Sequence, residues 1–265
     1  MFNFLVVFLF GLALGSFSNV CIYRVPLNLS VATPRRSFCP WCNHQIQWHQ
    51  NIPVLSFILQ RARCAFCKSL ISSRYLFVEL LLPILGLTFL TIKSSTLYVD
   101  FLFIGFTLFF AVVISFIDLD WRIIPDTLSM PWLMATFLFA PFNPAMASLG
   151  WEQSYAQSVF GAAMAAFVVW VTLFLGRVVK NRDVMGWGDV KLMACWGALL
   201  GWVHGTIVFF VAAALATVWI VFCFVFKKLR SNEFLPFGPF INIAGVLLLW
   251  IHLVVWKDVP SFVTK

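Results

Sequence analysis

The sequence predicts an all-α polytopic membrane protein with about eight transmembrane helices and one small polar block after the first helix. Three observations support this fold class. Hydrophobic residues make up 62% of the 265 residues and charged residues only 11%, whereas about half of a soluble domain is apolar and about a quarter is charged. Apolar runs of membrane-spanning length recur along the chain. The basic residues also gather in alternate loops, which is typical of a protein that spans the bilayer several times.

Eight segments are predicted to cross the bilayer as helices. The first has no Lys or Arg before Arg24 and therefore lacks the basic region of a cleaved signal peptide, so we expect it to be retained. The fourth and sixth segments are short for a crossing. The eight segments are residues 2–22, 76–92, 97–117, 128–142, 158–179, 190–203, 205–226 and 237–256.

The basic residues predict the orientation of the chain. If every segment crosses, all of the 18 Lys and Arg residues except Lys93, Lys257 and Lys265 fall on one face. The positive-inside rule makes that face cytoplasmic. The net charge of +8 then reflects topology and lipid contact, and it gives little support for nucleic-acid binding. Three parts are expected: a first transmembrane helix (1–23), a cytoplasmic domain (24–75) and a transmembrane core (76–257).

The cytoplasmic block contains two Cys-x-x-Cys pairs separated by 21 residues. Each pair can turn two thiolates toward one ion, and two such pairs complete a tetrahedral zinc site of structural type. Two disulfides or a redox pair are the alternative, which a reducing cytoplasm disfavours. His44 and His49 are expected to be surface polar residues, because four cysteines already fill the zinc shell. The predicted ligands are Cys39, Cys42, Cys64 and Cys67.

Two aspartates stand at the ends of apolar segments on the predicted cytoplasmic face. Asp118 follows the apolar run 106–117, and Asp189 ends the tetrapeptide Gly186-Trp187-Gly188-Asp189. Ionisable groups at membrane depth are rare and usually functional. Two neighbouring carboxylates cannot easily both ionise, and a pair that shares a proton can activate water as aspartic proteases do. Asp126, just before the fourth segment, is expected to be an ordinary helix N-cap.

Other interpretations of the aspartates remain open at this point. A loop with a helix N-cap at Asp189 would explain the tetrapeptide without any chemistry. A proton-coupled transporter would use Asp118 and Asp189 as a relay, although its acids are expected nearer the middle of the membrane. A zinc-domain membrane adaptor would have no catalysis at all. The sequence contains neither an HExxH metalloprotease motif nor a GxSxG elbow.

Several motifs together resemble those of the bacterial type IV prepilin peptidases, a family of GxGD intramembrane aspartic proteases that are also N-methyltransferases. The resemblance extends from Gly15 to Gly245. The motifs are Gly15-Ser16-Phe17-Ser18-Asn19-Val20, Tyr23-Arg24-Val25-Pro26, the cysteine pairs with Asn51-Ile52-Pro53 and Arg74-Tyr75, Asp118 with Ile124-Pro125-Asp126, Met185-Gly186-Trp187-Gly188-Asp189-Val190-Lys191, and Pro236-Phe237-Gly238-Pro239-Phe240.

The resemblance implies a function. Such an enzyme cleaves the leader of a prepilin or pseudopilin, from type IV pilus or type II secretion systems, after a glycine at the cytoplasmic face of the bacterial inner membrane. It then methylates the new N-terminal residue, usually Phe, with S-adenosylmethionine. Carried over by motif, Asp118 and Asp189 are the catalytic residues. Glu79 is a candidate cofactor contact, with a helix-end role as the alternative. Pro236–Pro239 are expected either to shape the substrate groove or only to start a helix.

Overall fold

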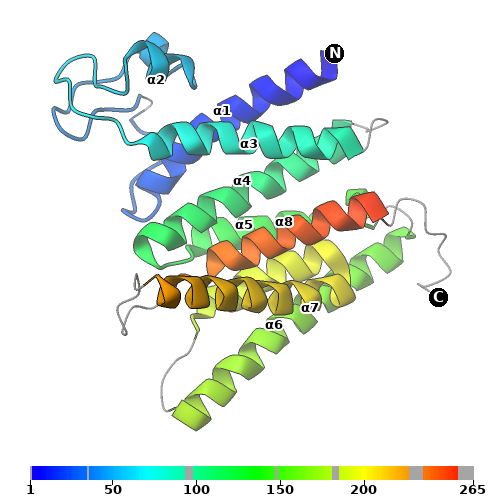
Figure 1. Ribbon diagram of the computed structural model, residues 1–265. Coiled ribbons are helices and arrows are strands. Elements are labelled where there is room, and N and C mark those ends of the chain that lie inside the picture. Colours follow the sequence, from blue (N-terminus) through cyan, green and yellow to red (C-terminus); the bar gives the residue numbers. More distant parts are fainter. Residues whose placement is uncertain are drawn as a thin grey trace. The chain divides into compact units, whose positions relative to one another are not determined.

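The computed structural model describes residues 2–34, 36–92, 98–146, 149–180, 185–226 and 235–255. These residues are nearly all helical, and the extended pairing among them consists of the isolated bridges Phe38–Gln45 and Arg63–Leu70. The elements (Figure 1) are α1 Phe2–Arg24, η1 Trp48–Asn51, α2 Leu55–Leu59, α3 Ser73–Ile92, α4 Tyr98–Trp121, α5 Asp126–Leu138, η2 Ala140–Phe142, α6 Trp151–Lys180, α7 Trp187–Val225 and α8 Gly238–Val255.

The predicted fold class, a polytopic all-α membrane protein, is confirmed. Six of the described helices are long and apolar enough to cross a membrane, namely α1, α3, α4, α6, α7 and α8. The predicted number of about eight was therefore approximate. The predicted segment 128–142 forms α5, which has 13 residues, and the short 3-10 helix η2. At 1.5 Å per residue α5 extends only about 20 Å, less than the thickness of a bilayer core.

The predicted segments 190–203 and 205–226 lie in one element, α7. This element has 39 residues, interrupted at Gly201, whose backbone has φ 76° and ψ 177°. A Cβ added to Gly205 would lie 2.6 Å from the Cα atom of Gly197. Residues eight apart on an unbroken helix are about 12 Å apart, so the chain folds back at Gly201. The two predicted segments are thus the two arms of a helical hairpin inside α7.

The chain divides into two compact units, residues 1–113 and 114–265. In the first unit, α1 and α3 lie side by side (Figure 1). A Cβ on Gly11 would lie 2.5 Å from the Cα atom of Pro83, and one on Gly15 would lie 2.7 Å from the Cα atom of Glu79. From Gly11 to Gly15 along α1, the contacting residue of α3 moves back from Pro83 to Glu79, so the two helices are antiparallel. Small residues let membrane helices approach this closely.

In the second unit, α6 and the first arm of α7 cross at Gly161 and Gly197. A Cβ on either glycine would overlap the carbonyl oxygen of the other. Small side chains also surround the crossing, where Ala162, Ala194 and Ala198 form a buried cluster. This close packing holds the first arm of α7, which begins at Trp187, in place within the unit.

We expect Gly197→Val to destabilise the second unit, because the added side chain would force the two backbones apart. Overpacking of this kind costs about 1–3 kcal/mol. The measurement is thermal unfolding in detergent, followed by tryptophan fluorescence. Gly150→Val is the matched control, because a Cβ on Gly150 meets nothing within 4 Å. Equal melting temperatures for the two variants would contradict this description of the crossing.

The topology prediction rests partly on residues whose structure is not described. Arg35, Lys93, Arg182, Lys227, Lys228, Arg230, Lys257 and Lys265 lie outside the described residues, as does the end of the expected core at 256–257.

Candidate active site and metal centre

The structure brings Asp118 and Asp189 together within the second unit. Asp118 lies in the last turn of α4, and Asp189 lies in the first turn of α7. Both side chains are buried, with 5% and 8% of their surface exposed, and the turn that carries Asp189 packs against the segment after Asp118, where a Cβ on Gly188 would lie 2.7 Å from Ile124 Cβ. Two acids that are 71 positions apart in the sequence therefore form one buried carboxylate pair at the ends of two membrane helices.

Asp118 is held by the start of α8. The backbone N–H of Gly238 donates a hydrogen bond to Asp118 Oδ2 at 2.8 Å. A Cβ on Gly238 would lie 2.7 Å from the same oxygen, so only glycine leaves room for the carboxylate. The first N–H groups of a helix have no partner inside the helix and carry partial positive charge. A helix N-terminus is therefore a natural partner for a buried aspartate.

This contact settles what Pro236–Pro239 do locally. The motif starts a helix, which was one of the two roles expected of it, and Gly238 is the first residue of α8. It also supplies the amide that binds Asp118, which sequence reasoning missed. The available signal was a glycine placed between prolines directly before an apolar segment, because such a glycine presents an uncovered N–H.

Asp189 is held by its own turn. The N–H of Gly186 donates to Asp189 Oδ2 at 3.0 Å, and Asp189 is the third residue of α7. This is an ordinary helix-start contact. The expected N-cap at Asp189 is wrong, because Gly186 occupies the N-cap position, although the tetrapeptide does begin a helix. Asp189 is also buried, as is Asp118 of α4, and a capping contact does not require such burial.

Two contacts draw the start of α7 against the segment that follows α4. A Cβ on Gly188 would lie 2.7 Å from Ile124 Cβ, so the absence of a side chain allows close approach. Lys191 Nζ forms an ion pair with Asp126 Oδ1 at 2.6 Å.

The predicted N-cap role of Asp126 is wrong, because Pro125 occupies the N-cap position and Asp126 lies in the first turn of α5. Its partner in the ion pair is Lys191 of α7.

The four predicted zinc ligands come together in the first unit. The sulfur atoms of Cys39, Cys42, Cys64 and Cys67 all lie within 4.8 Å of one another, and none is in a disulfide. The Sγ atoms of Cys39 and Cys67 are 3.8 Å apart. A tetrahedral zinc with Zn–S distances of 2.3 Å places its sulfur atoms about 3.8 Å apart. The cluster is compatible with zinc.

The two cysteine pairs are built as the same small hairpin, repeated 25 positions later in the sequence. In each, the N–H of the first cysteine bonds to a carbonyl five residues on, and the residue after the second cysteine has a positive φ and donates back to the first cysteine. The hairpins are Cys39–His44 with Asn43 at φ 54°, and Cys64–Ser69 with Lys68 at φ 60°. Each hairpin presents two sulfur atoms to the cluster.

Local hydrogen bonds favour the thiolate form of Cys67. The Ser69 hydroxyl lies 3.1 Å from Cys67 Sγ. Hydrogen bonds from this hydroxyl and from the Ser69 backbone lower the pKa of the Cys67 thiol to about 6. A thiolate is the form that binds metal. His44 is not a ligand in this arrangement, because its ring stacks on Phe66 with 4.4 Å between ring centroids.

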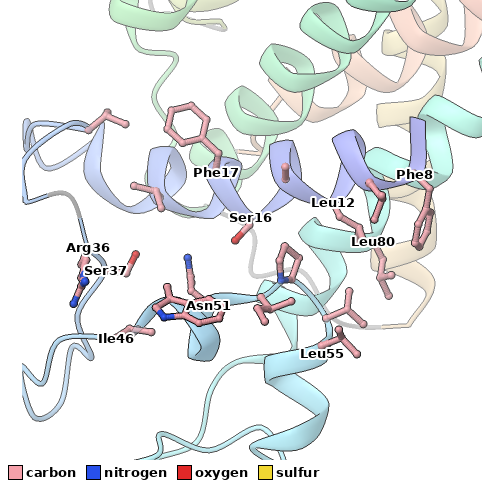
Figure 2. A pocket seen from close by; sticks show the side chains of 18 of the residues that line it. Phe8, Leu12, Ser16, Phe17, Arg36, Ser37, Ile46, Asn51, Leu55 and Leu80 are labelled. Carbon is pink, nitrogen blue, oxygen red and sulfur yellow. The ribbon is translucent and has the colours of Figure 1, made fainter. Parts of the chain in front are cut away.

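Two cavities adjoin the cysteine block. The larger, about 870 Å³, lies between α1 and the segment that leads into α2 and is mostly apolar (Figure 2). The smaller, about 410 Å³, is lined by both cysteine hairpins and by Asn19, Tyr75 and Glu79. The cavities are neighbours, because they share the lining residues Ser16, Val20, Arg24, Ser37, Ile46 and Asn51.

Glu79 ties three elements of the first unit together. Its Oε2 atom accepts a hydrogen bond from the N–H of Val54 at 2.8 Å, and its carboxylate also bonds to Ser16 of α1. Glu79 lies in the second turn of α3, opposite Gly15. It therefore joins α1, α3 and the segment before α2, and it lines the smaller cavity as well.

Comparison with known proteins gives two family matches in succession. The bacterial peptidase A24 N-terminal domain matches residues 9–93, and the type IV leader peptidase family matches residues 105–221. Proteins named prepilin leader peptidase/N-methyltransferase from Aeromonas salmonicida (strain A449), Vibrio cholerae and Legionella pneumophila are 33%, 33% and 32% identical to the chain. Their alignments cover 93%, 93% and 97% of this chain and 90%, 96% and 92% of the relatives. No solved structure matches the chain.

These matches cover both halves of the chain, including the cysteine hairpins and both aspartates. The similarity is close enough, and long enough, to establish descent. The chain belongs to the type IV leader peptidase family.

Proposed function

We propose that this protein is an aspartic endopeptidase of the bacterial inner membrane that removes the leader of type IV prepilins or pseudopilins. It cleaves after a glycine and then methylates the new N-terminal residue, usually Phe, with S-adenosylmethionine. Membership of the family supports prepilin processing. The names of the relatives from Aeromonas, Vibrio and Legionella include both activities.

The observation that carries the peptidase half is the buried pair Asp118 and Asp189. When such a pair holds one proton, its ionised member takes a proton from water while the other donates one to the peptide carbonyl oxygen. The water oxygen bonds to the carbonyl carbon. The C–N bond then breaks as the leaving amine receives a proton.

Backbone amides prepare both carboxylates for this chemistry. Gly238 donates to Asp118 and Gly186 donates to Asp189, in each case to Oδ2. Because Gly238 begins α8 and Gly186 is the N-cap of α7, both donors are held by the ends of helices before substrate arrives. Groups that are already oriented do not need to be reordered during the reaction.

We expect Gly238→Ala to lower kcat for prepilin cleavage by about 10- to 100-fold, because the methyl group would push Asp118 Oδ2 aside. A displacement of about 1 Å can cost 10²-fold in rate. The control is Gly105→Ala on the same helix as Asp118, where the added atom would have ordinary contacts of 3.7 Å and longer. Steady-state cleavage of a prepilin peptide measures both. A wild-type kcat in Gly238→Ala would exclude this role for the glycine.

The orientation of the site follows from charge. The basic residues Arg122 and Lys191 lie beside Asp118 and Asp189 in the sequence, and the positive-inside rule places segments rich in Lys and Arg in the cytoplasm. We therefore assign cleavage to the cytoplasmic side. In this arrangement residues 1–23 anchor the chain, residues 24–75 form the cytoplasmic zinc domain, and residues 76–257 form the peptidase core.

The methyltransferase half is assigned to the two neighbouring cavities of the first unit. S-adenosylmethionine, when bound, supplies an electrophilic methyl group. The smaller cavity offers a carboxylate from Glu79 and the polar side chain of Asn19, which suit the hydroxyl and amino groups of that cofactor. The larger, apolar cavity suits the apolar N-terminal segment of a cleaved pilin (Figure 2). The two cysteine hairpins line the smaller cavity and, with zinc bound, would hold the shape of that cavity.

A proton-coupled transporter is the alternative. It would need acids in series across the membrane. Among the residues that the structure describes, the buried acids are Asp118 and Asp189, which lie together at the ends of their helices. This placement favours hydrolysis at one face over conduction between two faces.

The test is mass spectrometry of a candidate prepilin incubated with the purified protein and S-adenosylmethionine. We expect an N-terminus that has lost its leader and gained one methyl group. Intact prepilin after incubation with folded protein would refute the peptidase, and a cleaved, unmethylated product would refute the methyltransferase.

A further inference from the structure

A chain of polar side chains, of which Trp196 and Asn242 are buried and Ser115 is half-buried, runs across the helices α7, α8 and α4. The Trp196 indole N–H on α7 donates to Asn242 Oδ1 on α8 at 2.9 Å. The Asn242 amide N–H donates in turn to the Ser115 hydroxyl on α4 at 2.9 Å. Trp196 is fully buried, and Asn242 is 3% exposed. One asparagine amide therefore joins the helix that carries Asp189 to the helix that carries Asp118.

The three side chains share helix faces with the groups of the active site. Ser115 lies three residues before Asp118 on α4, and Asn242 lies four residues after Gly238 on α8. Trp196 lies seven residues after Asp189 on α7. Residues at these separations lie on one face of a helix. The contacts Asn242–Ser115 and Gly238–Asp118 are thus successive links between the same two helices.

Packing fixes the orientation of the Trp196 indole. A Cβ on Gly245, one turn beyond Asn242, would overlap the indole ring, so α8 lies directly against it. On its other side the ring contacts Trp132 of α5 edge to face, with 5.4 Å between centroids. A tryptophan held in this way directs its N–H at a single place, which is the oxygen of Asn242.

We propose that Asn242 is a positioning residue for the peptidase, whose amide holds α4 and α7 in the register that brings Asp118 and Asp189 together. The inference rests on the proposed function of the two aspartates. A buried amide without partners is costly in an apolar interior. A register that keeps the hydrogen bonds of Asn242 to Trp196 and Ser115 avoids this cost. Sliding of either helix would break a link and move its aspartate.

The test is Asn242→Leu, which keeps the approximate size of the side chain and removes both hydrogen bonds. We expect kcat for cleavage to fall by about 10- to 100-fold. KM should stay near the wild-type value, because Asn242 positions the two aspartates and is not proposed to contact the substrate. Methylation of an already cleaved pilin should be unchanged. Ser115→Ala and Trp196→Phe, which each remove one link, should have smaller effects. Adding Ser115→Ala to Asn242→Leu should change nothing further.

Asn143→Leu is the matched control. It also removes a buried asparagine amide of the second unit, one that donates to the Leu199 carbonyl at 2.6 Å and contacts neither aspartate. It should lower the melting temperature and leave kcat near wild type. A wild-type kcat in Asn242→Leu, or an equal loss of kcat in Asn143→Leu, would overturn the proposal. Retained cleavage in Asp118→Asn or Asp189→Asn would instead refute the proposed function.

Discussion

Replacement of either Asp118 or Asp189 by asparagine is expected to abolish prepilin cleavage while the protein still inserts into the membrane. Asparagine keeps the shape and the acceptor oxygen that binds the Gly238 or Gly186 amide, but it cannot exchange a proton. Loss of general acid–base catalysis costs about 10²- to 10⁴-fold in rate. The double variant should be no worse than either single variant, because the two groups act as a unit.

The matched control is Asp120→Asn, two residues from Asp118 on the exposed end of α4. It should cleave like the wild type. Every variant should also methylate a pilin that was cleaved beforehand, which shows that the protein is folded. Cleavage at the wild-type rate by either active-site variant would remove the basis for an aspartic mechanism.

Removal of one zinc ligand is the second change with a large expected effect. Cys39→Ser should lower the zinc content from about one ion per chain and should abolish methylation, because metal binding supplies most of the folding free energy of small zinc domains. Cys64→Ser should have the same effect, since it occupies the equivalent position of the second hairpin. Elemental analysis and methylation of a cleaved pilin are the measurements.

Cys223→Ser is the control, because that thiol is free and lies outside the cluster. It should keep both zinc and methylation. Full methylation in a zinc-free Cys39→Ser variant would show that the metal has no structural role in this activity.

The sequence was sufficient for features that depend on composition and spacing. Apolar runs located the helices, and the spacing of two Cys-x-x-Cys pairs identified four sulfur atoms that do come together. It was less informative where one residue decides between two backbone paths. Gly197, Gly201 and Gly205 look alike in the sequence, yet only Gly201 has a positive φ and reverses the chain.

The same limit applies to the site. The charge of the loops led to the prediction that Asp118 and Asp189 share one face, but that prediction also assumed that the segment now seen as the short helix α5 crosses the bilayer. The Gly238 amide could not be assigned from the sequence, because a backbone N–H looks the same at every position. Asn242 was weakly indicated by the sequence as the one side-chain amide in the apolar run of α8, but its contacts with Trp196 and Ser115 depend on how three helices pack.

The central claim is that Asp118 and Asp189 together bind the transition state of peptide hydrolysis. The most direct measurement is the affinity for a prepilin peptide whose scissile bond is replaced by a hydroxyl-bearing isostere, compared with the same peptide lacking the hydroxyl. The wild type should prefer the hydroxyl compound by at least about 100-fold, as expected for a transition-state analogue. Asp118→Asn and Asp189→Asn should bind the two peptides equally. A preference that persists in either variant would contradict the claim.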